Sequence, residues 1–193
     1  MNDAGSARGA WRIIAALLLL TATAATRAQS LDLPRLMQLL AAAPAGEVAF
    51  TEKKFSNLLS APVVSAGKLV YRRPDIVEKN IDTPRKENYR FAGEELVVTR
   101  DGKERRIPLS SQPLLAAFAA SLRGVLGGDI VLLQKHYELS LQGDEPSWRL
   151  DMTPIDEETR RYVQRVTVSG RAGRVSQIEV RETSGDLSVL KVR

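Results

Sequence analysis

The sequence predicts a mainly β fold of the α+β class, with about ten strands in one large curved antiparallel sheet or open barrel and with two helices. Three observations predict it. Apolar and polar residues alternate at a period of two through most of the chain, as expected for strands with one buried face. Short turn signals separate these stretches, so consecutive strands can pair as antiparallel hairpins. Helical spacing occurs in only two places, which argues against repeated βαβ units.

The first 28 residues have the pattern of a secretory signal peptide. Arg8 and Arg12 form a basic region, residues 13–20 are apolar, and Thr26 and Ala28 occupy the −3 and −1 positions of a cleavage site. The alternative is an uncleaved anchor, but a membrane span needs about 20 apolar residues. Position 29 is Gln rather than Cys, so no lipid attachment is expected. Residues 1–28 are therefore predicted to be removed, and residues 29–193 to form one domain in the periplasm.

Composition excludes several classes of protein. The chain has 28 basic and 23 acidic residues and a formal net charge of +5, without a polybasic run or interleaved aromatic residues, so a nucleic-acid module is not expected. It contains no cysteine, although an exported protein could form disulfides. Packing alone must therefore stabilise the fold, which is more typical of a bacterial periplasmic domain than of a small disulfide-rich scaffold.

Residues 31–43 are predicted to form the first helix. Asp32 can cap it, Pro34 suits its first turn, and Pro44 with Gly46 ends it. The period then changes to two, and Asp101-Gly102 is a strong signal for a two-residue hairpin turn. The strands predicted in this part of the chain are residues 47–55, 65–73, 76–82, 86–91, 95–100 and 103–107.

Residues 111–126 interrupt the strand pattern with a second helix. Ser110 or Ser111 can cap it, and Gly127-Gly128 ends it. Alanines fill the positions between its large apolar residues, so it is apolar nearly all round, unlike an amphipathic surface helix. This helix is expected to be buried or to cover something apolar.

The last third of the chain returns to strands, and its polar residues give no pattern for catalysis. The predicted strands are residues 137–141, 148–153, 162–169, 175–182 and 187–192. His136 is expected on the polar face of a strand and has no second histidine or cysteine with which to bind a metal. No nucleophile elbow or glycine-rich phosphate loop occurs, and the acidic residues at 144–145 and 156–158 are expected at hairpin tips. We therefore expect no enzyme, no metal and no cofactor.

Two interpretations of the apolar sheet face remain open from the residues alone. A closed small barrel fills its interior with side chains, and both helices could simply complete that core. An open sheet covered by a mobile apolar helix would instead leave a cavity for an apolar ligand.

The stretch GKLVYRRP, residues 67–74, carries two arginines at the end of an apolar strand. Alternation places Arg73 on the face of Leu69 and Tyr71, and Arg72 on the opposite face with Val70. A guanidinium on an apolar face needs hydrogen-bond acceptors, and the carbonyl groups at the C-terminus of a covering helix are suitable ones. The alternative is that Arg73 extends along the surface into solvent.

Taken in order, these features resemble the periplasmic outer-membrane lipoprotein carrier family (LolA-like), in its divergent branch. The resemblance begins with a signal peptide, an N-terminal helix and a strand that starts Phe50-Thr51-Glu52, and it spans most of residues 31–193. The matching motifs, none highly specific alone, are Gly67-Lys68-Leu69, Arg73-Pro74, a Pro84 loop, the central apolar helix, Gly128-Asp129, Trp148-Arg149-Leu150 and Gly185-Asp186.

The resemblance implies an unclosed antiparallel β half-barrel with an N-terminal helix and a central apolar lid helix over a hydrophobic cavity. It implies a carrier that takes acylated cargo from an inner-membrane donor complex to an outer-membrane acceptor, and a lid latch at Arg73. The chain departs from typical members at residues 75–79, which are not rich in aromatic residues, and at Glu52, where many have glutamine. The cargo could therefore be a glycolipid rather than a lipoprotein.

The leading hypothesis is a monomeric periplasmic carrier of acyl chains. Two alternatives are a lipid-sensing regulatory module of the same fold and, with less support, a hydrolase. The residues predicted to contact lipid are the large apolar residues of the inward strand faces and of the lid helix: Phe50, Leu69, Tyr71, Ile76, Phe91, Leu96, Phe118, Leu122, Trp148, Leu150 and Met152.

Overall fold

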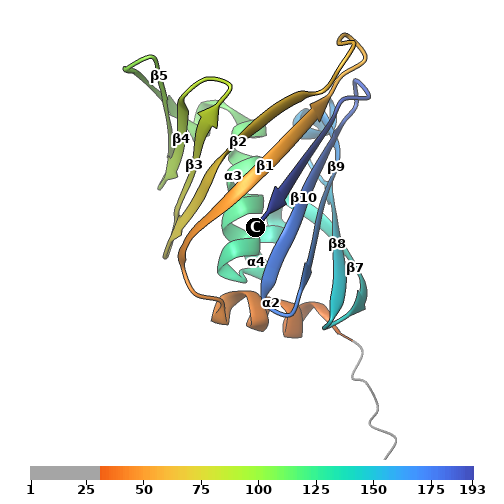
Figure 1. Ribbon diagram of the computed structural model, residues 1–193. Coiled ribbons are helices and arrows are strands. Elements are labelled where there is room, and N and C mark those ends of the chain that lie inside the picture. Colours follow the sequence, from red (N-terminus) through yellow and green to blue (C-terminus); the bar gives the residue numbers. More distant parts are fainter. Residues whose placement is uncertain (1–30) are drawn as a thin grey trace, which may run out of the picture.

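The computed structural model describes residues 31–193, and the predicted signal peptide with its cleavage site lies outside these residues. The described chain forms one antiparallel sheet of eleven strands, with helices on one side of it (Figure 1). The helical elements are α2 (Leu33–Ala42), η1 (Leu109–Ser111), α3 (Pro113–Gly127), α4 (Ile130–His136) and α5 (Glu157–Arg160). The strands are β1 (Gly46–Phe55), β2 (Val63–Arg72), β3 (Ile76–Thr83), β4 (Glu87–Ala92), β5 (Glu95–Arg100), β6 (Lys103–Pro108), β7 (Tyr137–Asp144), β8 (Ser147–Pro154), β9 (Val163–Arg171), β10 (Arg174–Glu182) and β11 (Leu187–Val192).

The sheet consists of two meanders joined at a single seam. Strands β1–β6 form the N-terminal meander and β7–β11 the C-terminal meander, in the spatial order β6-β5-β4-β3-β2-β1-β11-β10-β9-β8-β7. The first and last strands pair along the seam, where Phe50 faces Val192. Strands β6 and β7 lie at the two edges, so the sheet is unclosed. This arrangement confirms the predicted mainly β fold with an open antiparallel sheet.

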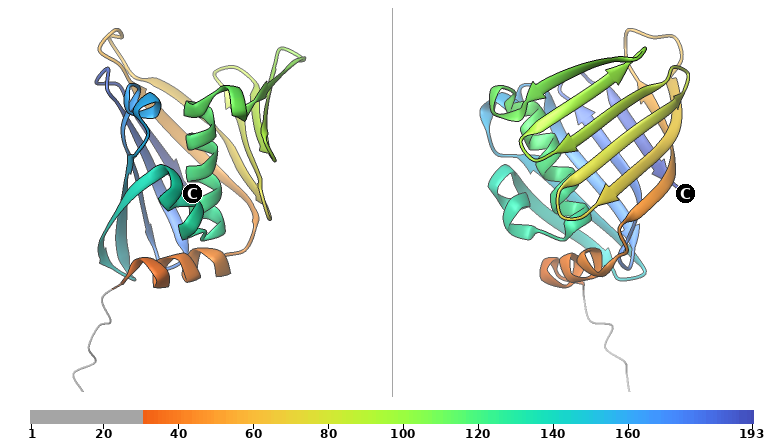
Figure 2. Two further views of the ribbon diagram at one scale, coloured as in Figure 1. Left: turned by 180° about the vertical axis from the view of Figure 1, so that it is seen from behind. Right: turned by 90° about the vertical axis from the view of Figure 1, so that its left-hand side faces the viewer.

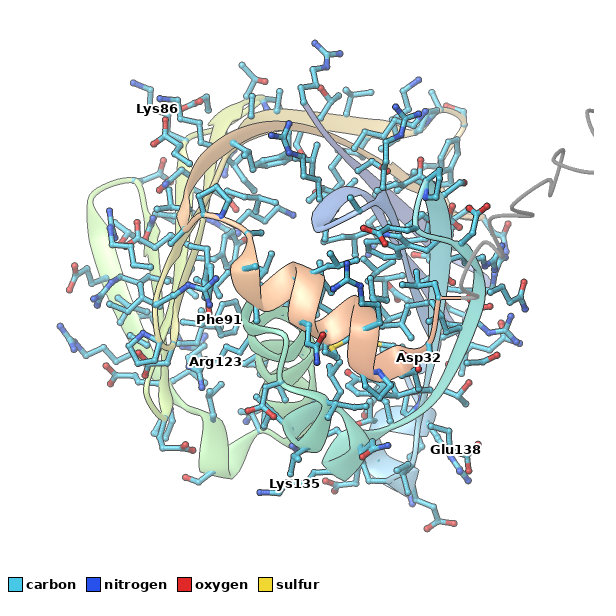
Figure 3. The ribbon with its side chains drawn as sticks, turned by 90° about the horizontal axis from the view of Figure 1, so that it is seen from below. Asp32, Lys86, Phe91, Arg123, Lys135 and Glu138 are labelled. Atoms are coloured by element: carbon cyan, nitrogen blue, oxygen red, sulfur yellow. The ribbon has the colours of Figure 1, made fainter. Side chains whose placement is uncertain are left out.

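The helices occupy the space that the curved sheet encloses. Helix α3 follows β6 and η1 in the chain and stands between the two walls of the sheet, while α2 crosses one end of it (Figure 2). Viewed from that end, α2 lies across the opening (Figure 3). The apolar central helix is thus inside the curve of the sheet.

Helix α2 forms where its sequence predicts it. The Asp32 side chain accepts a hydrogen bond of 2.8 Å from the backbone N–H of Arg35, which confirms the predicted cap. Leu36, Met37 and Leu40 recur at helical spacing and are all buried. The helix therefore buries one face against the interior of the sheet.

The structure corrects the prediction for His136. It is the last residue of α4 rather than a strand residue. Gly128, with φ of 68°, ends α3, and the side chain of the next residue, Asp129, caps α4 by accepting a 2.9 Å hydrogen bond from the N–H of Leu132. A seven-residue helix is too short to show a clear period in the sequence, which is why it was missed.

Two smaller predictions are also wrong. Helix α3 is capped by Gln112 without a side-chain hydrogen bond, because Ser111 lies in η1 and its hydroxyl donates to the Pro108 carbonyl instead. Asp156 is not at a hairpin tip but caps α5, accepting a 2.8 Å hydrogen bond from the N–H of Thr159. The predicted hairpin at Asp101-Gly102 is confirmed, with φ of 51° and 73°.

Two apolar clusters fill the interior. The C-terminal core joins α2, α3 and α4 to β7–β10, and its buried members include Leu36, Leu40, Ala117, Leu133, Trp148, Leu150, Met152, Val166 and Val168. The N-terminal cluster joins α3 and η1 to β2–β6 with a smaller buried set: Tyr71, Val77, Phe91, Leu96, Leu109 and Ala119. Helix α3 contributes to both clusters, so it links the two meanders.

Candidate functional site

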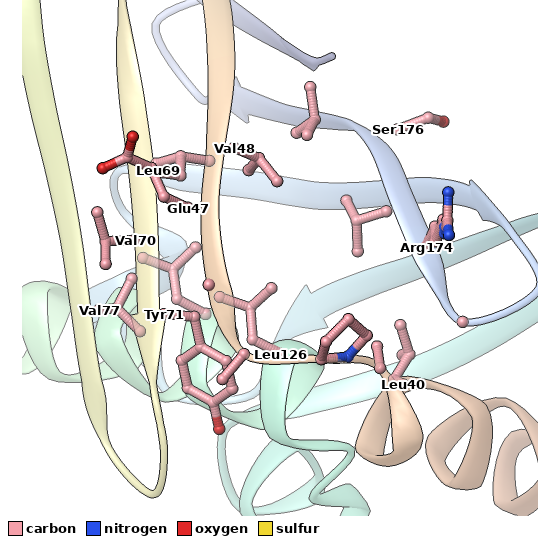
Figure 4. Close-up of a pocket in the computed structure, with 18 of the residues that line it drawn as sticks. Leu40, Glu47, Val48, Leu69, Val70, Tyr71, Val77, Leu126, Arg174 and Ser176 are labelled. Carbon is pink, nitrogen blue, oxygen red and sulfur yellow. The ribbon is translucent and has the colours of Figure 1, made fainter.

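A cavity of about 570 Å³ lies between the two meanders, at the end of the sheet that α2 crosses (Figure 4). This volume is within the range of about 300–1,000 Å³ that is usual for small-molecule sites. Its apolar lining residues are Leu40, Ala43, Pro44, Ala45, Val48, Leu69, Val70, Tyr71, Val77, Leu122, Leu126, Val175, Ile178 and Val192. Its polar lining residues are Glu47, Arg171, Arg174, Ser176 and Arg193. The site is therefore an apolar space with a charged margin.

Strand pairing brings the wall residues of the N-terminal meander together. Val48 of β1 faces Leu69 of β2, and Tyr71 of β2 faces Val77 of β3. Residues opposite one another in adjacent strands point to the same side of a sheet. On the helix side, Leu122 and Leu126 are four residues apart in α3 and so share one face.

The seam between the meanders completes the cavity. Val192 of β11 lies opposite Phe50 of β1, and Ile178 of β10 lies opposite Leu190 of β11. The turn between β9 and β10 packs against α2, since a Cβ atom at Gly173 would lie 2.3 Å from the carbonyl oxygen of Leu39. One wall of the cavity therefore comes from each meander.

The residues predicted to contact lipid fall into several groups. Leu69, Tyr71 and Leu122 line the cavity. Phe91, Leu96 and Phe118 belong to the N-terminal cluster, where the rings of Phe91 and Phe118 are 5.8 Å apart. The predicted residues of β8, namely Trp148, Leu150 and Met152, are fully buried in the C-terminal core.

Phe50 and Ile76 lie elsewhere. Phe50 is buried, with the Lys79 ammonium group 5.3 Å from the centre of its ring. Ile76 faces Arg72 in the β2–β3 pairing and is absent from the cavity lining, which contains its neighbour Val77 instead. Ile76 and Val77 are both apolar, so the alternation of apolar and polar residues does not decide which of the two points inward.

Several lining residues were not among the predicted ones. Leu126 could have been found, because it follows Leu122 at helical spacing. Val175, Ile178 and Val192 carry no local signal, since their place in the cavity depends on the pairing of β1 with β11.

The two arginines of GKLVYRRP make different contacts. The Arg73 guanidinium donates hydrogen bonds to the carbonyl oxygens of Ala41 and Ala43, the second at 2.7 Å, and lies 5.6 Å from the centre of the Tyr71 ring. These carbonyls are at the C-terminus of α2, where a cation is favourable. Arg72 instead forms an ion pair of 2.7 Å with Glu78. Arg73 thus connects the end of β2 to the helix that crosses the opening.

Helix α3 is attached to both meanders by polar contacts. The Tyr137 hydroxyl donates to the carbonyl oxygen of Ala117 at 2.9 Å, and burial raises the pKa of this tyrosine to about 12. On the other side, the Arg123 guanidinium donates to the Gly93 carbonyl oxygen at 2.6 Å. The N–H of Gly93 in turn donates to the Asp75 carboxylate. The helix is therefore held at one buried point and at one exposed turn.

Beyond the cavity, the concave face of the N-terminal meander carries charges that already have partners. Lys79 forms a 2.6 Å ion pair with Glu52, which also accepts a hydrogen bond from Ser65. The hydrogen bond from Tyr89 is the main reason that the pKa of Glu87 is lowered. This end of the concave face is therefore polar, and the apolar lining is confined to the part near α2 and α3.

The described residues form neither a metal-binding cluster nor a membrane-spanning helix. Across residues 31–193, no group of three or more His, Cys, Asp or Glu side chains is placed to hold a metal ion. None of the helices described in this part of the chain is long and apolar enough to cross a membrane. What the arrangement offers is an apolar volume.

The chain matches one family of known proteins. The model of the family described as "Outer membrane lipoprotein carrier protein LolA-like" matches residues 24–191. A comparison with curated proteins finds no match.

Several solved structures are similar to the chain. A LolA superfamily protein from Nitrosomonas europaea has a TM-score of 0.45 and 16% identity, over 83% of this chain and 89% of that one. A DUF1329 family protein from Desulfovibrio piger has a TM-score of 0.45 and 16% identity, over 84% and 89%. The lipoprotein LppX from Mycobacterium tuberculosis has a TM-score of 0.43 and 10% identity, over 83% and 93%.

Proposed function

The chain belongs to the outer membrane lipoprotein carrier protein LolA-like family, and we propose that it is a periplasmic carrier that binds acyl chains in the cavity beside α2. The observation that carries the proposal is the apolar cavity between the two meanders. An acyl chain costs about 0.8 kcal/mol for each CH₂ group exposed to water, so its passage between two membranes requires an apolar container. No catalytic step and no cofactor enter this function.

The open sheet supports a container that can load and release. Within residues 31–193, β6 and β7 do not pair, so the two walls are joined at the seam and through the helices. A ligand that enters between α3 and the sheet would therefore move the two walls apart without breaking a pairing between β6 and β7. Within this proposal the chain acts as a monomer, receives cargo from an inner-membrane donor complex and delivers it to an outer-membrane acceptor.

Arg73 has the geometry of a latch for the closed state. Its hydrogen bonds to Ala41 and Ala43 hold the C-terminus of α2 against the end of β2, and Ala43 itself lines the cavity. A latch that stabilises the empty closed state competes with cargo and so favours release. The residues proposed to contact the acyl chain are those predicted residues that line the cavity, Leu69, Tyr71 and Leu122, together with Phe91, Leu96 and Phe118 of the adjoining cluster.

Native mass spectrometry of the protein isolated from the periplasm tests binding, and a transfer assay from donor to acceptor vesicles tests carriage. We expect acylated molecules bound to the isolated protein. We also expect lipid to pass from donor to acceptor vesicles faster when the protein is present than when it is absent. Bound lipid without transfer would instead indicate a lipid sensor, and appearance of cleaved lipid would indicate a hydrolase. If neither a lipid nor an apolar dye binds, the proposal is wrong.

A pair of variants on β2 locates the site. Leu69→Trp adds volume at the cavity wall and is expected to lower the affinity for an apolar dye about tenfold, which corresponds to about 1.4 kcal/mol. Val64→Trp on the same strand is the matched control, because Val64 is 48% exposed and lies outside the cavity lining. Equal loss of affinity in both variants would place the dye elsewhere.

A further inference from the structure

The margin of the cavity carries unneutralised positive charge. Arg171 and Arg174 flank the turn between β9 and β10, Arg193 follows β11, and all three are exposed residues of the lining. Within residues 31–193, no side-chain carboxylate lies within 4.0 Å of any of the three guanidinium groups. Among the described residues, the side-chain carboxylate in the lining is that of Glu47, which is paired with Lys68 at 2.7 Å.

Arg171 and Arg174 also face one another. They are cross-strand partners on either side of Ala172 and Gly173. Like charges directly opposite in an antiparallel pair repel, and an anionic group beside both guanidiniums would relieve this repulsion. In Figure 4, Arg174 lies on the side of the cavity away from Leu69 and Tyr71. A ligand with its apolar part against β2 and α3 would therefore present its other end to the β9–β10 turn.

We propose that the cargo is a lipid with an anionic headgroup, whose phosphate or carboxylate binds Arg171 and Arg174 while its acyl part occupies the cavity. This rests on the proposed function and narrows its ligand class. Guanidinium groups bind such anions through two parallel hydrogen bonds, which an uncharged ester or sugar headgroup cannot match. Positive charges beside apolar walls of low dielectric constant also focus the electric field, which raises the local concentration of an anionic headgroup.

The same two strands supply a matched control. Arg165 of β9 and Arg181 of β10 are also cross-strand partners, and neither lines the cavity. The variants R171S/R174S and R165S/R181S therefore remove the same charge from the same strands. They differ in whether the removed arginines border the cavity.

Calorimetric titration with dioctanoyl phosphatidylglycerol and with uncharged dioctanoylglycerol separates the contribution of the headgroup from that of the chains, because both lipids carry the same acyl chains and only the first carries a phosphate. The wild type is expected to bind the anionic lipid about tenfold more tightly at low salt, since two exposed charge contacts are added. R171S/R174S should lose this preference while still binding both lipids, and R165S/R181S should keep it.

The outcomes distinguish the two proposals. Equal affinity of the wild type for both lipids, or a preference that survives in R171S/R174S, overturns the anionic headgroup. Glycerol phosphate that binds as tightly as the anionic lipid also overturns it, because the site would then take a free anion without the cavity. Failure of both lipids to bind contradicts the proposed function itself.

Discussion

The two meanders are both antiparallel, but they are packed differently. In the C-terminal meander, Trp148, Leu150 and Met152 of β8 pack in one core with α2, α3 and α4. Each of these three side chains is at most 2% exposed. In the N-terminal meander, the large residues that α3 contributes, including Phe118 and Leu122, are only partly buried. One half is a conventional core, and the other leaves space next to it. The difference shows that an apolar strand face lines a cavity only where the helices do not fill it.

The largest expected effect is a loss of stability in the C-terminal core. Leu150 is fully buried, so Leu150→Ala should lower the free energy of unfolding by about 2–5 kcal/mol. Leu69→Ala at the cavity wall should cost about 1 kcal/mol or less, because that side chain is only half-buried beside existing space. Urea denaturation of both variants measures the contrast. Similar losses would mean that the two halves are equally well packed.

A smaller effect is expected at the buried contact between α3 and the C-terminal meander. Tyr137→Phe removes one hydrogen bond to Ala117 and should cost about 1 kcal/mol at neutral pH. Because burial raises the pKa of Tyr137 from 10.0 to about 12, the unfolded state ionises first. The stabilising contribution is therefore complete below pH 10 and is lost as the pH rises through about 12.

The pH dependence can be isolated by comparing urea midpoints from pH 8 to 12. The difference between wild type and Tyr137→Phe should shrink above pH 10. Tyr162→Phe is the control, since Tyr162 is 58% exposed and should show no such trend. A difference between wild type and Tyr137→Phe that stays constant across this range would argue against the buried phenol as its source.

The smallest effect on global stability is expected at Arg73. Arg73→Leu removes exposed hydrogen bonds to the end of α2, so the cost should stay near 1 kcal/mol and be local. Amide hydrogen exchange in residues 39–45 should accelerate about tenfold. Bound lipid should leave more slowly, because the closed empty state no longer competes as well.

Arg72→Leu is the matched control for the latch. It removes the neighbouring guanidinium, which pairs with Glu78 rather than with α2. Exchange in α2 and lipid release should both be unchanged in this variant. Wild-type release kinetics in Arg73→Leu would contradict the latch.

Local features of the fold could be predicted from the sequence where one residue determines one contact. Asp32 indicated the start of α2, and Asp101-Gly102 indicated a hairpin with two positive φ angles. Helix α4 was missed because its seven residues follow α3 after only two capping residues, Gly128 and Asp129. A helix as short as this, between a glycine and a strand, has too few residues to show the helical period of apolar positions.

The cavity could be predicted only in part. Leu69 and Tyr71 follow from alternation in β2, but Trp148 and Leu150 have the same pattern and are packed core. Alternation identifies the apolar face of a strand and not what covers it. Val192 depends on pairing between the first and last strands, which no local pattern in the sequence specifies.

That pairing has a consequence for the order of events during folding. Lys54 and Glu182, in contact across the seam, are 128 residues apart, so the seam is among the contacts of highest sequence separation in the fold. Strands β1–β6 can form their hairpins from local contacts, whereas the cavity wall that β10 and β11 supply depends on the seam. The cavity is therefore incomplete until the last strand of the chain has joined the sheet.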